Sequence, residues 1–107
     1  MCGFVGLLGN KNNWLGSKLI NTELDRMSKV ILERGPDNYH KYISDEEMLG
    51  LAFRRLSILD LSISAQQPML ARSKNWIIVF NGEIYNFQEI REIVNNNKDF
   101  WRTKSDS

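Results

Sequence analysis

A chain of 107 residues, with 42% apolar and 25% charged residues, has the composition of a single small globular domain. The net charge is only +1 and the basic residues are scattered among acidic ones, which excludes the basic stripe that a nucleic-acid backbone requires. The longest apolar runs are about five residues, far short of the ~20 that cross a bilayer, so we expect no nucleic-acid partner and no membrane partner.

The chain contains one cysteine, Cys2, and one histidine, His40. These two residues cannot build a structural zinc site, and a lone cysteine makes no disulfide within the chain, so we expect no metal. A free thiol is typical of the reducing cytoplasm, which is the predicted location. The feature to explain is a thiol beside the chain terminus.

The first segments of the chain predict a strand and a helix. The apolar stretch Phe4–Leu8 is interrupted by glycines, which indicates a short strand packed closely against other backbone. Thr22, followed three residues later by Asp25, resembles a helix-capping box, and apolar residues then recur at helical spacing. We therefore expect a helix from about Leu24 to Glu33, ended by the Gly-Pro pair at 35–36.

A hairpin is expected next. The stretch Tyr39–Ile43 alternates polar and apolar residues, Ser44–Glu47 is a polar turn, and Met48–Leu56 again has the character of a strand. A second hairpin is expected further along. There Trp76–Phe80 is an apolar strand, and the Asn-Gly pair at 81–82 is typical of a two-residue turn before the apolar character resumes.

The last segments predict a helix and a strand. Asn86, followed three residues later by Glu89, repeats the capping signature and introduces a helix through about Val94. We expect one more strand at Phe100–Thr103. No repeat, low-complexity segment or linker indicates a domain boundary.

Cys2 has a chemical property that follows from its position. Removal of Met1 would put an α-amino group and a nucleophilic thiol on one residue. A free cysteine titrates near ~8.5 and is helped by a base, and an α-amino group, at ~7.7–8.0, is a better base at neutral pH than lysine at ~10.4. His40 lies on a predicted hairpin strand, where a histidine is more often an ordinary surface residue. Taken alone, a terminal cysteine is more often incidental.

Short blocks elsewhere in the chain change that interpretation. They are Met1–Gly6, Arg34–Asp37, Arg55–Asp60, Gln67–Met69, Asn81–Asn86 and Lys104–Asp106. In this order they resemble the class II glutamine amidotransferases over essentially the whole chain. The Arg-Gly-Pro-Asp and Asn-Gly-Glu-Ile-Tyr-Asn blocks are similar to those of the asparagine synthetase branch.

The resemblance implies a fold and a reaction. The fold is that of an amino-terminal nucleophile hydrolase, an α+β protein with a four-layer αββα sandwich of antiparallel sheets. In the reaction, the Cys2 thiol attacks the side-chain amide of glutamine, which gives a glutamyl thioester and ammonia, and water then releases glutamate. The ammonia passes to an ATP-dependent synthetase domain or subunit. No cofactor is implied in the glutaminase domain itself, and ATP and magnesium are expected only for the synthetase domain.

The resemblance also implies an oxyanion hole. Asn81 and the backbone N–H of Gly82 match the donors that stabilise the developing negative charge, so loss of the Asn81 side chain should cost on the order of 10²–10³ in rate. Taken alone, the same pair is only a type I′ turn. Both interpretations hold together if the turn exposes its N–H groups to the substrate.

Substrate contacts are carried over in the same way. Arg55 matches the residue that grips the α-carboxylate of glutamine, a task suited to the bidentate guanidinium. Taken alone, Arg55 is equally well a solvated strand residue. Taken alone, the acidic residues Glu83 and Asp106 are more often surface charges. The remaining implied contacts are the loop residues Leu56, Ser57, Ile58 and Leu59, and the acids Glu83 and Asp106, which meet the α-amino group. The Arg34–Asp37 block is interpreted as structural support, with its Gly-Pro pair as a helix stop.

The chain departs from the pattern of the family at a few positions. Glu33 and Phe53 stand where relatives usually carry histidine, and Ala65-Gln66 replaces an expected Gly-His pair. We expect residues 1–107 to be the N-terminal part of the glutaminase domain, with the fold incomplete, Met1 removed and the synthetase domain absent. Such a chain should be marginally stable or should associate.

A second hypothesis is a truncated, non-catalytic remnant or partner-binding subunit of the same fold. The joint presence of Cys2, Arg55, Asn81, Gly82 and Asp106 favours the enzyme. The sequence leaves open whether the ammonia acceptor is aspartate or another carboxylate or sugar-linked substrate, and it leaves the oligomeric state open.

Overall fold

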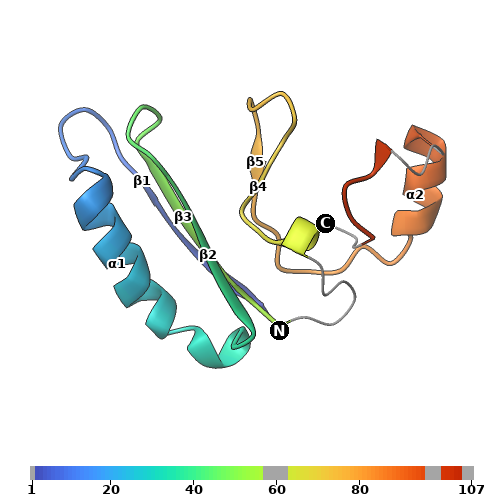
Figure 1. Cartoon of the computed structure of the whole chain (residues 1–107), viewed down its shortest axis with the longest axis horizontal. Helices are drawn as coiled ribbons and strands as arrows, with labels where there is room; N and C mark the ends of the chain where they lie inside the picture. The colour runs from blue at the N-terminus through green and yellow to red at the C-terminus, as the bar shows by residue number, and fades with distance from the viewer. Residues whose placement is uncertain (1, 57–62, 96–99, 105–107) are drawn as a thin grey trace.

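A three-stranded antiparallel sheet with a helix along one face is the main feature of the computed structural model, which describes residues 2–56, 63–95 and 100–104 (Figure 1). A second, two-stranded antiparallel sheet and a second helix follow in the chain. The bounds are Gly3–Leu8 for β1, Ser17–Lys29 for α1, Asn38–Ser44 for β2, Leu49–Arg55 for β3, Met69–Leu70 for β4, Ile77–Ile78 for β5 and Phe87–Val94 for α2, with 3-10 turns at Leu32–Arg34 (η1) and Ile63–Ala65 (η2). Mixed α and β structure with antiparallel sheets agrees with the predicted α+β class.

The larger sheet has the order β1-β3-β2, so β3 is the central strand. The predicted hairpin of β2 and β3 is confirmed, with Asn38 opposite Arg55. The predicted first strand is also confirmed, and it begins one residue early, with Gly3 opposite Arg54. The start of β1 and the end of β3 therefore lie side by side at one end of the sheet.

The core lies between α1 and one face of this sheet. Ile20 and Leu24 of α1 and Ala52 of β3 are buried there. A Cβ on Gly50 would lie 2.6 Å from a methyl carbon of Ile20, so only glycine allows the helix to pack this closely on β3. The surrounding partly buried residues are Val5, Leu7, Trp14, Tyr39 and Ile43.

The predicted bounds of the first helix were wrong. The helix begins at Ser17, after Gly16, whose φ of 84° is readily adopted only by glycine. Thr22 lies inside the helix and its hydroxyl donates to the Lys18 carbonyl at 3.3 Å, so Thr22 is not a cap. The helix ends at Lys29, and the 3-10 turn η1 then leads to the Gly-Pro pair at 35–36, which is not its stop.

The predicted second hairpin was also wrong. β5 covers only Ile77–Ile78 and pairs backward with β4, with Met69 opposite Ile78. Phe80 pairs with the side-chain amide of Gln67 and not with a following strand. Phe80 N donates to Gln67 Oε1 at 2.5 Å, and Gln67 Nε2 donates to the Phe80 carbonyl at 3.3 Å. Residues 81–86 thus form a loop rather than a hairpin turn.

The end of the described chain contains one confirmed and one wrong prediction. α2 follows Asn86 as expected, although the Asn86 side chain makes no capping bond. Phe100–Thr103 is not a strand. Arg91 explains this, because its guanidinium lies over the Trp101 ring, 5.0 Å from the centroid, and donates to the Thr103 carbonyl at 2.8 Å. The segment is held by a side chain of α2, not by a strand ladder.

A charged cluster joins α1 to the sheet. Lys41 Nζ and the Tyr39 hydroxyl both donate to Asp25 Oδ1 at 2.7 Å. The Arg54 guanidinium lies 4.5 Å from the centroid of the Tyr39 ring, and its Nε donates to the Ser28 carbonyl at 2.9 Å. The hydrogen bonds from Lys41 and then Tyr39 hold the pKa of Asp25 below its usual value.

This cluster predicts a pH-dependent stability difference between the wild type and Asp25→Asn. The pKa of Asp25 is lower in the folded chain, so its contribution to the free energy of unfolding is complete above the ordinary value of 3.8 and is lost as the pH falls through the folded value. Thermal melts should show the wild type ahead near neutral pH, with the gap closing in acid. Tyr39→Phe should lose part of the same advantage. A gap that stays constant into strong acid would contradict this assignment.

Candidate active site

The thiol of Cys2 lies at the end of the sheet where β1 begins and β3 ends. Cys2 is half-buried and precedes β1 by one residue. The backbone N–H of Leu56 donates to Cys2 Sγ at 3.3 Å, and Sγ in turn lies 3.5 Å from the Leu56 carbonyl, to which it can donate. The structure therefore brings together two of the residues that the sequence singled out, although they are far apart in the chain.

Arg55 is the last residue of β3 and is only 7% exposed, which does not fit the alternative of a solvated strand arginine. Its neighbour Arg54 contacts Ser28 on the α1 side, so the alternation of the strand directs Arg55 to the other face. Val5 packs toward α1, so the same alternation directs Cys2 away from the helix. Cys2 and Arg55 thus share the face that α1 leaves uncovered.

The loop after β5 carries the predicted oxyanion donors. Asn81, Gly82 and Glu83 are all exposed, and the loop connects β5 to α2 (Figure 1). Gln67 holds its beginning through Phe80, and a Cβ on Gly82 would lie 2.9 Å from the Phe80 ring. Within residues 2–56, 63–95 and 100–104, no hydrogen bond joins this loop to Cys2. The placement of these residues as oxyanion donors to a substrate on the thiol therefore stays a prediction.

Several predicted site residues lie outside the described part of the chain: Ser57, Ile58, Leu59 and Asp106. His40 is described and lies on β2, opposite Phe53 of β3. Because β3 separates β2 from β1, His40 is two strands away from the thiol. That position agrees with the interpretation of His40 as an ordinary strand residue.

The sequence did not reveal the role of Gln67. Its side chain is 6% exposed and makes both hydrogen bonds of the amide to the backbone of Phe80. The Gln-Pro-Met block was noticed, but a glutamine gives no signal of which backbone it will bind.

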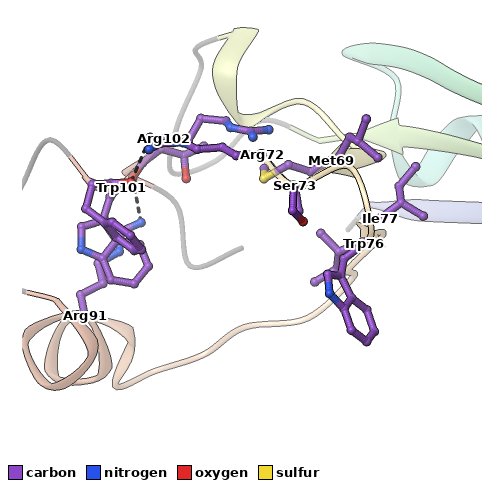
Figure 2. A pocket seen from close by; sticks show the side chains of 13 residues that line it. Met69, Arg72, Ser73, Trp76, Ile77, Arg91, Trp101 and Arg102 are labelled. Atoms are coloured by element: carbon purple, nitrogen blue, oxygen red, sulfur yellow. Dashed lines mark hydrogen bonds between the residues drawn. The ribbon is translucent and has the colours of Figure 1, made fainter.

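A cavity of about 830 Å³ lies apart from the residues of the candidate site. Figure 2 shows the side chains that line it. It lies between the β4–β5 pair and residues 100–103, and none of Cys2, Arg55 and Asn81 lines it. Trp76 and Ile77 lie on one side, with Arg91 and Trp101 stacked on the other. The cavity is apolar and does not contribute to the candidate site.

In the described ranges, no three His, Cys, Asp or Glu side chains come close enough together to hold a metal ion. No helix in this part of the chain has both the length and the apolar character needed to cross a bilayer.

Comparison with known proteins gives consistent matches. The model of the family described as "Glutamine amidotransferase domain" matches residues 1–107. Asparagine synthetase [glutamine-hydrolyzing] 1 of Bacillus subtilis is 38% identical over 107 residues, which are 100% of this chain and 16% of that protein. Asparagine synthetase [glutamine-hydrolyzing] 1 of Arabidopsis thaliana is 34% identical over 106 residues, 99% of this chain and 17% of that protein.

A third relative carries a different name. Amidase chry2 of Gibberella zeae is 36% identical over 75 residues, which are 70% of this chain and 11% of that protein. The chain thus spans less than a fifth of the length of each of these three relatives.

The Gln67 bonds predict a local effect on the loop that carries Asn81. Gln67→Leu leaves the N–H and carbonyl of Phe80 without their partner in a part-buried place, which should cost about 1–3 kcal/mol of stability. In Gln67→Leu, hydrogen exchange at the Phe80 amide should become faster than in the wild type, whereas exchange at the amides of β3 should change much less. Gln66→Leu, one residue away and without these bonds, should leave the exchange at Phe80 unchanged. Equal protection in both variants would refute the role of Gln67.

Proposed function

Because the chain belongs to the glutamine amidotransferase domain family, we propose that it performs the glutaminase half-reaction of an asparagine synthetase-like enzyme. The observation that carries this proposal is the contact of the Cys2 thiol with Leu56, directly beside the buried Arg55. A thiol and a buried guanidinium side chain thus lie at one end of the same sheet. Glutamine offers an amide to the first and a carboxylate to the second.

The proposed reaction begins after removal of Met1. The α-amino group of Cys2 accepts the thiol proton, and the sulfur attacks the side-chain amide carbon of glutamine. The carbon–nitrogen bond breaks, the accepted proton goes to the leaving nitrogen, and ammonia departs from a glutamyl thioester. Water then gives a proton to the same amine and attacks the thioester. The sulfur leaves as a thiol with that proton, and glutamate is released.

The loop after β5 supplies the oxyanion hole in this proposal. The Asn81 side chain and the backbone N–H of Gly82 would donate to the oxygen that becomes negative in each tetrahedral intermediate. The support is the hold of Gln67 on Phe80, which limits where the next residue can lie. Exposed N–H groups in a loop are free to meet a substrate.

Substrate orientation comes from charges of opposite sign at the two ends of the amino-acid group. The Arg55 guanidinium would bind the α-carboxylate as a bidentate pair. Its burial favours this, because charge-assisted hydrogen bonds between a guanidinium and a carboxylate are stronger away from water. The other proposed contacts are the segment Leu56, Ser57, Ile58 and Leu59, and the carboxylates of Glu83 and Asp106 at the α-ammonium group.

We also propose that the described sheet is one layer of a four-layer αββα sandwich. The face away from α1 carries Phe4, which is 47% exposed, and the half-buried Leu51, whereas Phe53 of β3 on the same face is already buried. An apolar sheet face is stable when a second layer covers it. In this proposal residues 1–107 form the N-terminal part of a cytoplasmic glutaminase domain. A synthetase domain or subunit, which uses ATP and magnesium, consumes the ammonia.

A non-catalytic, partner-binding role is the second candidate. It is favoured by the exposure of the Asn81 loop and by the lack of a hydrogen bond between that loop and Cys2 among the described residues. The two candidates differ in whether the thiol reacts with glutamine.

Labelling with a glutamine-mimicking diazoketone separates the two candidates. In a folded sample whose intact mass establishes loss of Met1, mass spectrometry should locate the adduct on Cys2, because the activated thiol attacks the reagent as it would the substrate. Excess glutamine should protect the thiol, and Cys2→Ser should take up no label. A folded, Met1-free sample that stays unlabelled would favour the non-catalytic role.

Asn81→Ala tests the oxyanion hole. Loss of one preorganised donor should lower kcat for glutamine hydrolysis by roughly 10²–10³-fold while KM changes much less, because the donor acts on charge that develops only in the transition state. The matched control is Asn75→Ala, an exposed asparagine in the turn between β4 and β5. Equal kcat values for both variants would remove Asn81 from the mechanism.

A further inference from the structure

The closest backbone approach at any glycine of the described chain lies directly beside the candidate site. Gly35 is buried, and a Cβ added to it would lie 2.4 Å from both the carbonyl carbon and the carbonyl oxygen of Arg54 and 2.6 Å from the nitrogen of Arg55. The tight contacts at Gly50 and Gly9 are mainly with side-chain atoms, which can move more easily. Gly35 instead meets the peptide bond between Arg54 and Arg55.

The two residues that this peptide bond joins are also held by other contacts. Asp37, two residues after Gly35, donates its backbone N–H to the Arg55 carbonyl at 3.0 Å. On the α1 side, the Arg54 side chain lies against the Tyr39 ring and donates to the Ser28 carbonyl at 2.9 Å. The end of β3 is thereby confined between the segment 35–37 and the helix.

The position of this peptide bond decides two features of the candidate site. Arg55 begins at its nitrogen, and the next N–H along the chain, that of Leu56, donates to Cys2 Sγ. A methyl group at 2.4 Å would have to move by about 1 Å to reach the 3.4 Å of an ordinary contact. A misplacement of ~1 Å at a reacting group can cost on the order of 10²-fold in rate.

We propose that Gly35 is a positioning residue that acts through the Arg54–Arg55 peptide bond, setting the place of the Arg55 guanidinium and of the Leu56 N–H relative to the Cys2 thiol. It touches neither the thiol nor the substrate. Its effect on glutamine rests on the proposed function, whereas its effect on the thiol does not. The Arg-Gly-Pro-Asp block thus has a task at the site, although it does not end α1, which already ends at Lys29.

The test compares Gly35→Ala with Gly16→Ala. The control also replaces a glycine, and its φ of 84° makes alanine strained there, but no atom lies within 4 Å of the added Cβ. Gly16→Ala should therefore lower Tm without moving β3. Both variants are measured at a temperature where each is fully folded.

Two readouts go with this pair. Gly35→Ala should raise KM for glutamine about tenfold, because a displaced guanidinium loses its bidentate grip. It should also slow alkylation of Cys2 by iodoacetamide about threefold, because the Leu56 N–H no longer stabilises charge on sulfur. Gly16→Ala should match the wild type in both. If Gly35→Ala matches the wild type in both KM and alkylation rate, the positioning role is wrong.

A second variant covers the case in which Gly35→Ala does not fold. Arg54→Lys keeps the charge but loses the planar group that bonds Ser28 and stacks on Tyr39, so it should shift KM and alkylation in the same directions by a smaller factor. A wild type that fails to hydrolyse glutamine would refute the proposed function. Alkylation alone would then decide the role of Gly35, since the contact between Leu56 and Cys2 exists without substrate.

Discussion

The register between β1 and β3 is the constraint on which the candidate site depends. Because Gly3 lies opposite Arg54, the residue before β1 falls beside the residues that end β3, and the Leu56 N–H reaches the thiol. A slip of one residue would turn every side chain of β1 to the other face and carry Cys2 to the side of α1. The position of the Cys2 thiol therefore depends on the pairing of β1 with β3, and this pairing depends on the packing of the core.

That core specifies the register through size as well as through polarity. Val5 and Leu7 lie on the face of the sheet that α1 covers and pack against the cluster of Ile20 and Leu24. Gly50, in the middle of the same face, leaves room for Ile20 where any side chain would collide. A shifted pairing would expose the apolar residues of β1 and break this close fit, so packing far from the thiol determines where the thiol lies.

The site combines parts with different degrees of support. Cys2 and Arg55 belong to the three-stranded sheet, where Asp37 and the side chain of Arg54 hold the end of β3. The Asn81 loop depends on one side chain, Gln67, and belongs to a smaller two-stranded sheet. Groups that must meet one substrate thus come from two structural units, and glutamine itself can join them in the proposed reaction.

The sequence alone determined what local rules can specify. The alternation of residues 39–56 predicted the hairpin, the apolar run after Gly3 predicted β1, and the ordered blocks identified the family, because these signals depend on near neighbours in the chain. Only the tertiary structure decided the start of α1 after Gly16 with its positive φ, the hydrogen bonds of the Gln67 amide to Phe80 where a hairpin was expected, and the contact of Gly35 with the end of β3. Each of these depends on which distant backbone lies nearby, and no pattern within a few residues carries that information.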